Sequence, residues 1–303
     1  MKLSIVIPVY NSHSILEELL IQINANVSFL KEFELILVND CSPDNSWNII
    51  SKLCEKYSFL KGINLRKNSG QHNAIMAGLN HTSGDVVIMM DDDLQHSPKY
   101  IEELYINIMQ GNDVCYTKFN TKKHKGWKII GSQFNDYIAN ILLKKPKGLY
   151  MSSFKAISKD IKNEIIKYDG PYAYIDGLIL SVTNNINTIN VEHHQRYDGE
   201  GNYTLISSIS LWAKMATGFS ILPLRIATYV GGIISFFSFL LLILFVVQKF
   251  VYNAMPDGWT SIIVLILFFG GVQLLSIGII GEYIGRIHLN LNKKAQYIIK
   301  EKI

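Results

Sequence analysis

Two long apolar segments limit what this chain can fold into more than any other feature of its sequence. Residues 226–247 carry no charged side chain, and residues 261–281 form a second run of the same kind. At about 1.5 Å per helical residue, each run is long enough to cross a hydrocarbon core of about 30 Å. Because basic residues gather outside both runs, the positive-inside rule predicts a transmembrane hairpin with both ends in the cytoplasm. The alternative is a buried helical hairpin in a soluble protein.

The net charge of the chain lies in this same region. From Arg225 onward the chain has seven basic and three acidic residues, which account for the whole net charge of +4. The remaining 22 basic and 22 acidic residues cancel. A generally basic, nucleic-acid-binding protein is therefore excluded, and we expect no nucleic acid among the partners. The chain is also too apolar, at 49% hydrophobic residues, for a disordered protein.

The cysteines and the first residues favour a location inside the cell. Three cysteines without a CxxC pair indicate neither a disulfide framework nor a zinc site, so a reducing compartment is the simplest interpretation. The apolar run after Met1 is interrupted by Pro8 and is too short for a signal peptide. We therefore expect the N-terminus to stay in the cytoplasm.

Strands and helices are predicted to alternate before the apolar segments. The predicted strands, rich in apolar and β-branched residues, are 3–9, 34–39, 62–65 and 85–90. The helices predicted to follow them are 14–27, 44–57, 71–80 and 98–109. This alternation predicts an α/β domain with a mostly parallel sheet. Two more helices are expected at 127–143 and 204–219, and the second fits either an interfacial helix or a core helix.

Three consecutive aspartates follow the fourth predicted strand. Open α/β sheets bind ligands beyond the carboxyl ends of their strands, and Asp91-Asp92-Asp93 comes directly after the apolar sequence VVIMM. A divalent cation would relieve the repulsion among these carboxylates. Asp91, Asp93 and Gln95 alternate along the chain, so their oxygens can face one side as ligands of Mg²⁺ or Mn²⁺. The alternative is a solvated acidic turn.

The other predicted strand ends each allow two interpretations. Asp40 could accept hydrogen bonds from a nucleobase or ribose, or it could be a turn or N-cap residue. Arg66 could bind a ligand or lie on the surface, and Gly70 permits close backbone approach. The motifs GxGxxG and GxxxxGK[ST] are absent, so the dinucleotide and P-loop modes of phosphate binding lack their signatures.

Seven motifs occur in a characteristic order along nearly the whole chain. They are IVIPVYN (5–11), LVNDCSPDNS (37–46), RKNSGQ (66–71), DDDLQ (91–95), YIDGLI (174–179), VEHHQRYDGEGNYT (191–204) and LPLR (222–225). The first four resemble family 2 glycosyltransferases of the GT-A fold. The others, with the two apolar runs, resemble the polyprenyl-phosphate branch of that family. This branch includes bactoprenol glucosyltransferases and undecaprenyl-phosphate aminoarabinose transferases.

The resemblance implies a donor site at the strand ends. The residues implied to bind the nucleotide-sugar are Pro8, Tyr10, Asp40, Arg66, Gln71, Asp91 and Asp92. Asp91, Asp93 and Gln95 would hold Mg²⁺ or Mn²⁺ together with the sugar diphosphate. The metal would act as a Lewis acid and offset the charge of the departing nucleoside diphosphate.

The resemblance also implies an acceptor site. Arg196, Lys123 and Lys125 would bind the acceptor phosphate, and the catalytic residues would be Asp93, Asp176 and Arg196. A phosphate monoester with a second pKa near about 6 is largely dianionic at neutral pH, so no strong general base is needed. Asp176 could hydrogen-bond a sugar hydroxyl, or it could simply be an acidic residue in the first turn of a helix. The basic stretch 118–128 could instead contact anionic lipids or be a solvated face.

The sequence therefore predicts a membrane enzyme of the bacterial inner membrane. Its parts would be a cytoplasmic GT-A domain at 1–220, two transmembrane helices within 221–285 and a basic cytoplasmic tail at 286–303. It would transfer one sugar from a nucleotide donor, expected to be UDP-linked, to a polyprenyl phosphate. The alternatives are a processive polysaccharide synthase and a non-catalytic scaffold or flippase accessory. Gly231-Gly232 and Gly270-Gly271 permit close helix packing within one chain or in a homo-oligomer.

Overall fold

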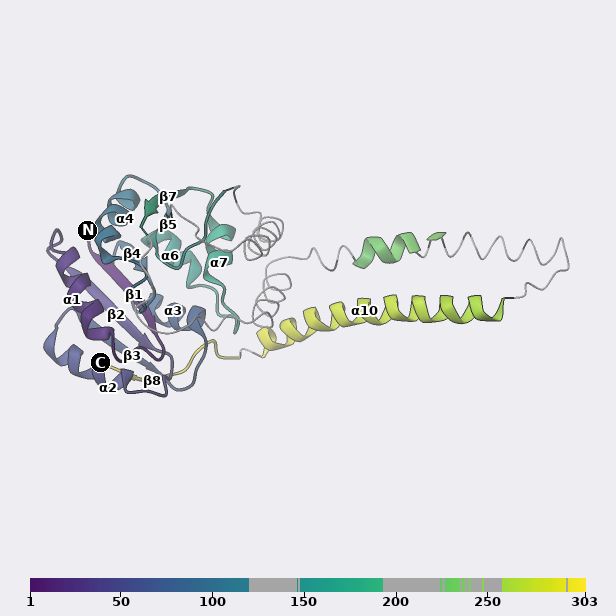
Figure 1. Ribbon diagram of the computed structural model, residues 1–303, viewed down its shortest axis with the longest axis horizontal. Coiled ribbons are helices and arrows are strands. Elements are labelled where there is room, and N and C mark those ends of the chain that lie inside the picture. The colour runs from purple at the N-terminus through teal and green to yellow at the C-terminus, as the bar shows by residue number, and fades with distance from the viewer. Residues whose placement is uncertain are drawn as a thin grey trace. The chain divides into compact units, whose positions relative to one another are not determined.

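The computed structural model forms two compact units (Figure 1). Its described residues are 1–119, 146, 148–192, 258–292 and 294–303, with scattered positions between 224 and 247. Unit 1 comprises Met1–Thr204 together with Lys293–Ile303, and unit 2 comprises Leu205–Asn292. The helices predicted at 127–143 and 204–219 lie outside the described residues.

An eight-stranded sheet forms the centre of unit 1, in the order β7-β5-β6-β4-β1-β2-β3-β8. Its strands are β1 (Leu3–Val9), β2 (Phe33–Asn39), β3 (Leu60–Leu65), β4 (Val86–Met89), β5 (Val114–Phe119), β6 (Lys155–Ser158), β7 (Ile186–Val191) and β8 (Ile299–Lys302). The four central strands β4, β1, β2 and β3 are parallel, and β5 is parallel to β7. Only β6 and β8 run antiparallel to their neighbours in the described sheet. The predicted mostly parallel sheet is confirmed.

Helices follow the strands of unit 1 as the alternating pattern predicted. They are α1 (Leu16–Asn26), α2 (Ser46–Lys56), α3 (Gln71–Leu79), the 3-10 turn η1 (Pro98–Tyr100), α4 (Ile101–Met109), α6 (Lys159–Ile165) and α7 (Ile175–Val182). The first four predicted strands and helices agree with these bounds to within two residues. The Ser97 side chain accepts a hydrogen bond from the Lys99 amide, which makes Ser97 the expected N-cap before Pro98.

Helices cover both faces of the central strands, which explains why these strands are continuous apolar runs. Leu3 and Ile5 of β1 belong to the same buried cluster as Leu16 and Leu20 of α1. Helix α3 packs closely on the sheet, because a Cβ atom at Gly78 would lie only 2.3 Å from the side chain of Val6. The core is therefore a layer of strands between helices, and the carboxyl ends of the parallel strands share one edge.

Strand β8 returns to this sheet after the whole of unit 2 and pairs with the edge of β3 (Figure 1). The Arg66 amide donates to the Ile298 carbonyl at 2.8 Å. The indole Nε1 of Trp47 donates to Glu301 at 3.1 Å. The sequence pattern predicts a basic tail and no strand at residues 286–303, whereas the structure places 299–302 in the sheet of unit 1.

Unit 2 contains one long apolar helix among its described residues, α10 (Trp259–Leu291). This helix includes the predicted second span, 261–281. Its segment Phe268–Leu289 is long and apolar enough to cross a membrane, and none of the segment is buried. The predicted first span, 226–247, is described only at scattered positions, and those positions are helical.

Candidate active site

The loops after β1, β2 and β4 each contain a non-glycine residue in the left-handed backbone region. These residues are Asn11 (φ 57°), Cys41 (φ 53°) and Leu94 (φ 57°). The left-handed conformation costs a residue with a Cβ atom about 1–2 kcal/mol, so it persists only where surrounding contacts impose it. Such positions concentrate at functional sites. The three loops meet at the carboxyl edge of the parallel sheet, where ligands of open α/β folds bind.

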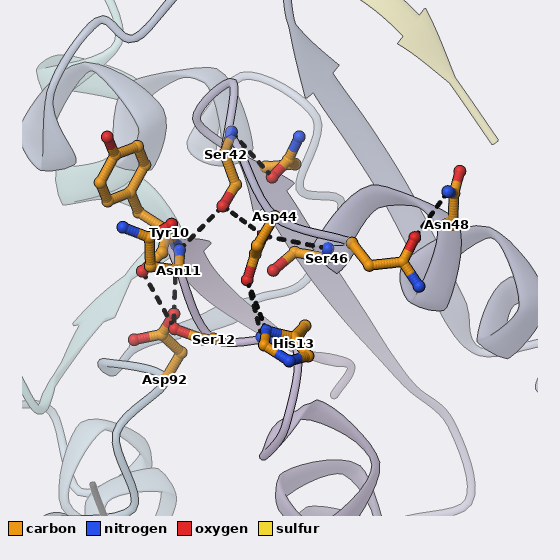
Figure 2. A network of polar contacts seen from close by, with 11 residues as sticks. Tyr10, Asn11, Ser12, His13, Ser42, Asp44, Ser46, Asn48 and Asp92 are labelled. Carbon is orange, nitrogen blue, oxygen red and sulfur yellow. Dashed lines mark hydrogen bonds and ion pairs between the residues drawn. The ribbon is translucent and has the colours of Figure 1, made fainter. Parts of the chain in front are cut away.

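Asp92 joins the loop after β4 to the loop after β1 (Figure 2). Its Oδ2 atom accepts hydrogen bonds from the Ser12 hydroxyl at 2.5 Å and from the Tyr10 amide at 3.3 Å. Burial is the largest influence on this carboxyl group and raises its pKa to about 6, although both hydrogen bonds oppose that change. Asp92 therefore faces the first loop and holds the two loops together.

Asp44 joins the loop after β1 to the loop after β2 (Figure 2). Its Oδ1 atom accepts from the Ser42 hydroxyl at 2.5 Å and from the Ser46 amide at 3.1 Å. Its Oδ2 atom accepts from the His13 amide at 3.1 Å, and the Ser42 hydroxyl also accepts from the Asn11 amide at 2.8 Å. Burial alone would raise the pKa of Asp44, but these hydrogen bonds outweigh burial and lower the pKa well below its usual value.

Asp40 fixes the loop that follows β3. This residue is only 4% exposed, and its two carboxylate oxygens accept hydrogen bonds from the amides of Ser69 at 2.7 Å and Gly70 at 2.8 Å. Gly70 has a φ of 87°, which a residue with a side chain rarely adopts. Burial raises the pKa of Asp40 against the opposing effect of the two amides. The turn and N-cap alternatives do not describe these contacts, because both partners lie on a different loop.

Asp91 and Gln71, two of the implied donor-binding residues, are brought together. The Gln71 Nε2 atom donates to Asp91 Oδ1 at 2.6 Å. Burial raises the pKa of Asp91, and the neighbouring Asp93 carboxylate raises it further, while a hydrogen bond from Ser153 opposes them. Asp93 Oδ1 accepts from the Gln95 amide at 3.1 Å. The loop therefore keeps mutually repelling carboxylates close together.

This arrangement suits a divalent cation bound together with a ligand. Among the described residues, no group of three or more His, Cys, Asp or Glu side chains forms a ready-made metal site. Mg²⁺ is nevertheless often held by one or two carboxylates, with phosphate oxygens and water completing its shell. The raised pKa values of Asp91 and Asp92 show that ionising them is costly here. A cation would reduce that cost, so the residues present fit the implied metal.

Asp176 lies in the first turn of α7, as the helix-terminus interpretation of this residue predicts. It is 8% exposed, and its Oδ1 atom accepts hydrogen bonds from the Tyr116 hydroxyl at 2.9 Å and from the Lys155 ammonium. Burial and the Asp176 charge together raise the pKa of Tyr116 well above its usual value. Asp176 is thus a buried, paired carboxylate.

The remaining residues implied by the resemblance differ in burial, and some lie outside the described part of the chain. Pro8 is buried in β1 opposite Val38, and the Tyr10 side chain is 47% exposed beyond the end of that strand. Arg66 has an exposed side chain, while its amide binds the segment before β8. The implied acceptor-phosphate residues Arg196, Lys123 and Lys125 lie outside the described residues.

Several residues of this edge were not identified from the sequence. Ser12, Ser42 and Asp44 link the loops, and the motif Ser-Pro-Asp-Asn-Ser does contain the turn-forming residues that could have indicated Asp44. No sequence pattern around Lys155 indicates that its side chain is buried or paired. A lysine at the start of a strand is usually exposed, whereas Lys155 is 3% exposed.

Comparison with known proteins shows the family to which the chain is related. Residues 4–166 match the family model described as glycosyl transferase family 2. The undecaprenyl-phosphate 4-deoxy-4-formamido-L-arabinose transferase of Shewanella sediminis (strain HAW-EB3) is 32% identical, over 98% of this chain and 91% of that protein. The protein of the same name from Proteus mirabilis (strain HI4320) is 30% identical, over 100% of this chain and 94% of that protein.

A solved structure shares the fold. Glucosyl-3-phosphoglycerate synthase from Mycobacterium tuberculosis, in complex with Mn²⁺, UDP and phosphoglyceric acid, superposes with a TM-score of 0.53 at 17% identity. The match covers 71% of this chain and 76% of that chain. The family model spans more than half of the chain, and both relatives match along almost its full length. The chain therefore belongs to glycosyl transferase family 2 and is a glycosyltransferase with a GT-A α/β domain.

Proposed function

We propose that this enzyme transfers a single sugar from a nucleotide-sugar to undecaprenyl phosphate or a similar polyprenyl phosphate. The observation that carries the proposal is the match, at 30–32% identity over at least 98% of the chain, to relatives named as undecaprenyl-phosphate sugar transferases. The carboxylate-rich strand ends support a donor site. The unburied apolar helix α10 supports an acceptor that resides in a membrane.

The donor site in this proposal lies at the loops after β1 to β4. Asp91, Asp93 and Gln95 would hold Mg²⁺ or Mn²⁺ with the diphosphate, and the metal would offset charge on the departing nucleoside diphosphate. Pro8, Tyr10, Asp40, Arg66, Gln71 and Asp92 would line the donor site. The superposed synthase was solved in complex with Mn²⁺ and UDP, which makes a UDP-linked donor our first choice.

The acceptor in this proposal needs charge neutralisation more than proton removal. A phosphate monoester is already largely dianionic at neutral pH, so its oxygen can attack the anomeric carbon without a strong general base. Arg196, Lys123 and Lys125 are the cations proposed to receive this phosphate. The pairing of Asp176 with Lys155 supports a role for Asp176 other than taking up a proton.

The pairing of β8 with β3 supports an even number of membrane crossings. Residues on both sides of unit 2 belong to one sheet, so the two ends of unit 2 must connect to the same side of any membrane. If α10 is one crossing, a second is required, and 226–247 is the segment long and apolar enough to provide it. We therefore propose the hairpin 226–247 and 261–281 in the bacterial inner membrane, with residues 1–220 and 286–303 in the cytoplasm.

The test uses membranes containing the full chain. They are incubated with undecaprenyl phosphate, Mg²⁺ or Mn²⁺, and labelled UDP-sugars that include UDP-4-deoxy-4-formamido-L-arabinose, the sugar in the relatives' names. Organic extraction followed by mass spectrometry should give a lipid carrying one sugar. Membranes with Asp93→Asn serve as the control and should give none.

Two outcomes would contradict the proposal. A polymeric product would favour the processive polysaccharide synthase. Absence of lipid-linked product with every donor, in membranes that contain folded enzyme, would exclude a polyprenyl phosphate acceptor among the sugars tested.

A further inference from the structure

Lys155 is a buried cation at the start of β6, next to the strand β4 that leads into the loop containing Asp91, Asp92 and Asp93. In the sheet it lies opposite Met89 of β4 on one side and Tyr116 of β5 on the other. Met89 is two residues before Asp91. The residue is 3% exposed, and its ammonium group lies 5.0 Å from the centre of the Tyr116 ring. The strand register therefore places this charge beside the loop that contains Asp91, Asp92 and Asp93.

The ammonium group of Lys155 forms an ion pair with Asp176 in the first turn of α7. The Tyr116 hydroxyl donates to the same oxygen, Oδ1, at 2.9 Å. Among the described residues, Tyr116 and Lys155 are the donors to the Asp176 side chain, and both donate to Oδ1. The Oδ2 atom is therefore available to a ligand. Two donors on one atom also fix the direction of the carboxylate.

The pairing with Asp176 also explains how the charge of Lys155 can be buried. A buried ammonium is costly unless it is paired, so retention of a lysine here needs Asp176 as its partner. Lys155 thus stabilises the Asp176 carboxylate while lying next to the strand that leads into the Asp91–Asp93 loop.

We propose that Lys155 is a positioning residue for sugar transfer, which holds the Asp176 carboxylate so that its Oδ2 atom accepts a hydrogen bond from a hydroxyl of the transferred sugar. This inference rests on the proposed function, because it assigns to Asp176 a sugar ligand bound at the strand ends. A hydrogen-bonding role for Asp176 agrees with an acceptor phosphate that is largely dianionic and needs no strong base. Lys155 itself touches no substrate in this proposal.

The test compares variants of the purified full-length enzyme. Lys155→Met removes the charge, Lys155→Arg keeps it, and Lys155→Met with Asp176→Asn removes both members of the pair. Lys162→Met is the matched control, because Lys162 is also buried, at 7% exposure, but lies on α6. For each variant, kcat, the KM of the nucleotide-sugar and the thermal midpoint are measured.

Lys155→Met should lower kcat about 100-fold, the cost expected when a positioning contact is lost. The donor KM should change less than about threefold, because metal and nucleotide contacts remain. Lys155→Arg should recover at least about tenfold of the lost kcat. The double variant should regain the thermal midpoint lost in Lys155→Met, because no unpaired charge stays buried, but it should not regain kcat. Lys162→Met should leave kcat within about twofold of wild type.

Three results would overturn the inference. The first is a Lys155→Met enzyme with wild-type kcat. The second is a double variant that recovers kcat together with its thermal midpoint, which would make the role of Lys155 purely structural. The third is a stable Lys155→Arg enzyme no faster than Lys155→Met. A wild-type enzyme that forms no lipid-linked sugar would instead overturn the proposed function, and this inference with it.

Discussion

The two ends of the parallel strands surround buried carboxylates with different partners. At the amino ends of β1 to β3, Glu34 accepts hydrogen bonds from the Lys61 ammonium at 2.6 Å and from the Ser4 hydroxyl at 2.5 Å. It also accepts from the amide and hydroxyl of Ser83 at 2.6 and 2.9 Å. At the carboxyl ends, the described donors to Asp92 are both neutral, the Tyr10 amide and the Ser12 hydroxyl.

The pKa values reflect this difference in partners. Burial acts in the same direction at both ends and would raise each pKa. At Glu34 the hydrogen bonds from Lys61, Ser4 and Ser83 outweigh burial and lower the pKa to about 2. At Asp92 the neutral donors do not outweigh burial, and the pKa rises to about 6. At the amino ends, Lys61 of the protein itself pairs with the Glu34 carboxylate. At the carboxyl ends no cation among the described residues pairs with Asp92, and carboxylates with raised pKa values are the pattern expected of a binding site.

The largest effect is expected from the carboxyl end. Asp93→Asn should lower sugar transfer about 1000-fold, because it removes a proposed metal ligand where charge develops in the reaction. Its thermal midpoint should stay equal to wild type or rise, because the substitution removes repulsion with Asp91. Product assays and thermal unfolding of the same preparation would check both expectations. A large fall in thermal midpoint would mean that this end is structural after all.

The opposite result is expected at the amino end. Glu34→Ala should lower the free energy of unfolding by about 3 kcal/mol, because the buried Ser4 hydroxyl and the Ser83 amide lose their acceptor and Lys61 loses its ion-pair partner. The kcat of the fraction that remains folded should be unchanged. Denaturant unfolding and active-site titration would measure the two quantities. An Ala variant with normal stability would remove the distinction between the two ends.

The pH dependence of stability should give a second distinction between the two ends of the strands, through Glu34 at the amino ends. Because the folded pKa of Glu34 is about 2 and its ordinary value is 4.5, its ionisation contributes stability above pH 4.5, and that stability is lost as the pH falls toward 2. Wild type should therefore be more stable than Glu34→Gln by about 2 kcal/mol above pH 5. The difference should shrink steadily below that pH, as thermal unfolding at a series of pH values would show. If the difference in unfolding free energy between wild type and Glu34→Gln did not depend on pH, ionised Glu34 would not be the source of this stability.

The smallest effect is expected for the contact between loops. Ser12→Ala removes the hydroxyl that donates to Asp92 and should cost about 1 kcal/mol of unfolding free energy. The donor KM should rise a few-fold, because the loop after β1 would be less constrained. Ser51→Ala in α2, where the hydroxyl binds only the Trp47 carbonyl, is the control and should leave KM unchanged. Equal KM values for both variants would show that the Asp92 contact does not shape the site.

The parts of this molecule that follow from local sequence were predicted well. The first four strands, their helices and the aspartate loop were identified because periodicity and turn residues report local structure. Gln71 and Asp91 were both assigned to the donor site because parallel strand ends share one edge, and the structure brings them into contact. Helix α10 followed from its apolar length.

The parts that depend on distant segments were not predicted. The four-residue strand β8 pairs with β3 more than 230 positions away, and no pattern within those four residues indicates that partner. Lys155 was missed because its partner Asp176 is placed by the packing of α7 and not by nearby sequence. For the same reason, the amide partners of Asp40 could not be anticipated from the Asp-Cys-Ser-Pro turn.

The late position of β8 in the chain has a consequence for how the enzyme is made. During translation, the outer edge of β3 emerges early but stays unpaired until α10 and the residues after it have left the ribosome. An open strand edge is a site where chains can stick together, so the nascent domain stays vulnerable throughout that interval. Synthesis of the long apolar helix therefore comes before the sheet is complete, so the catalytic domain can finish folding only after that helix has been made.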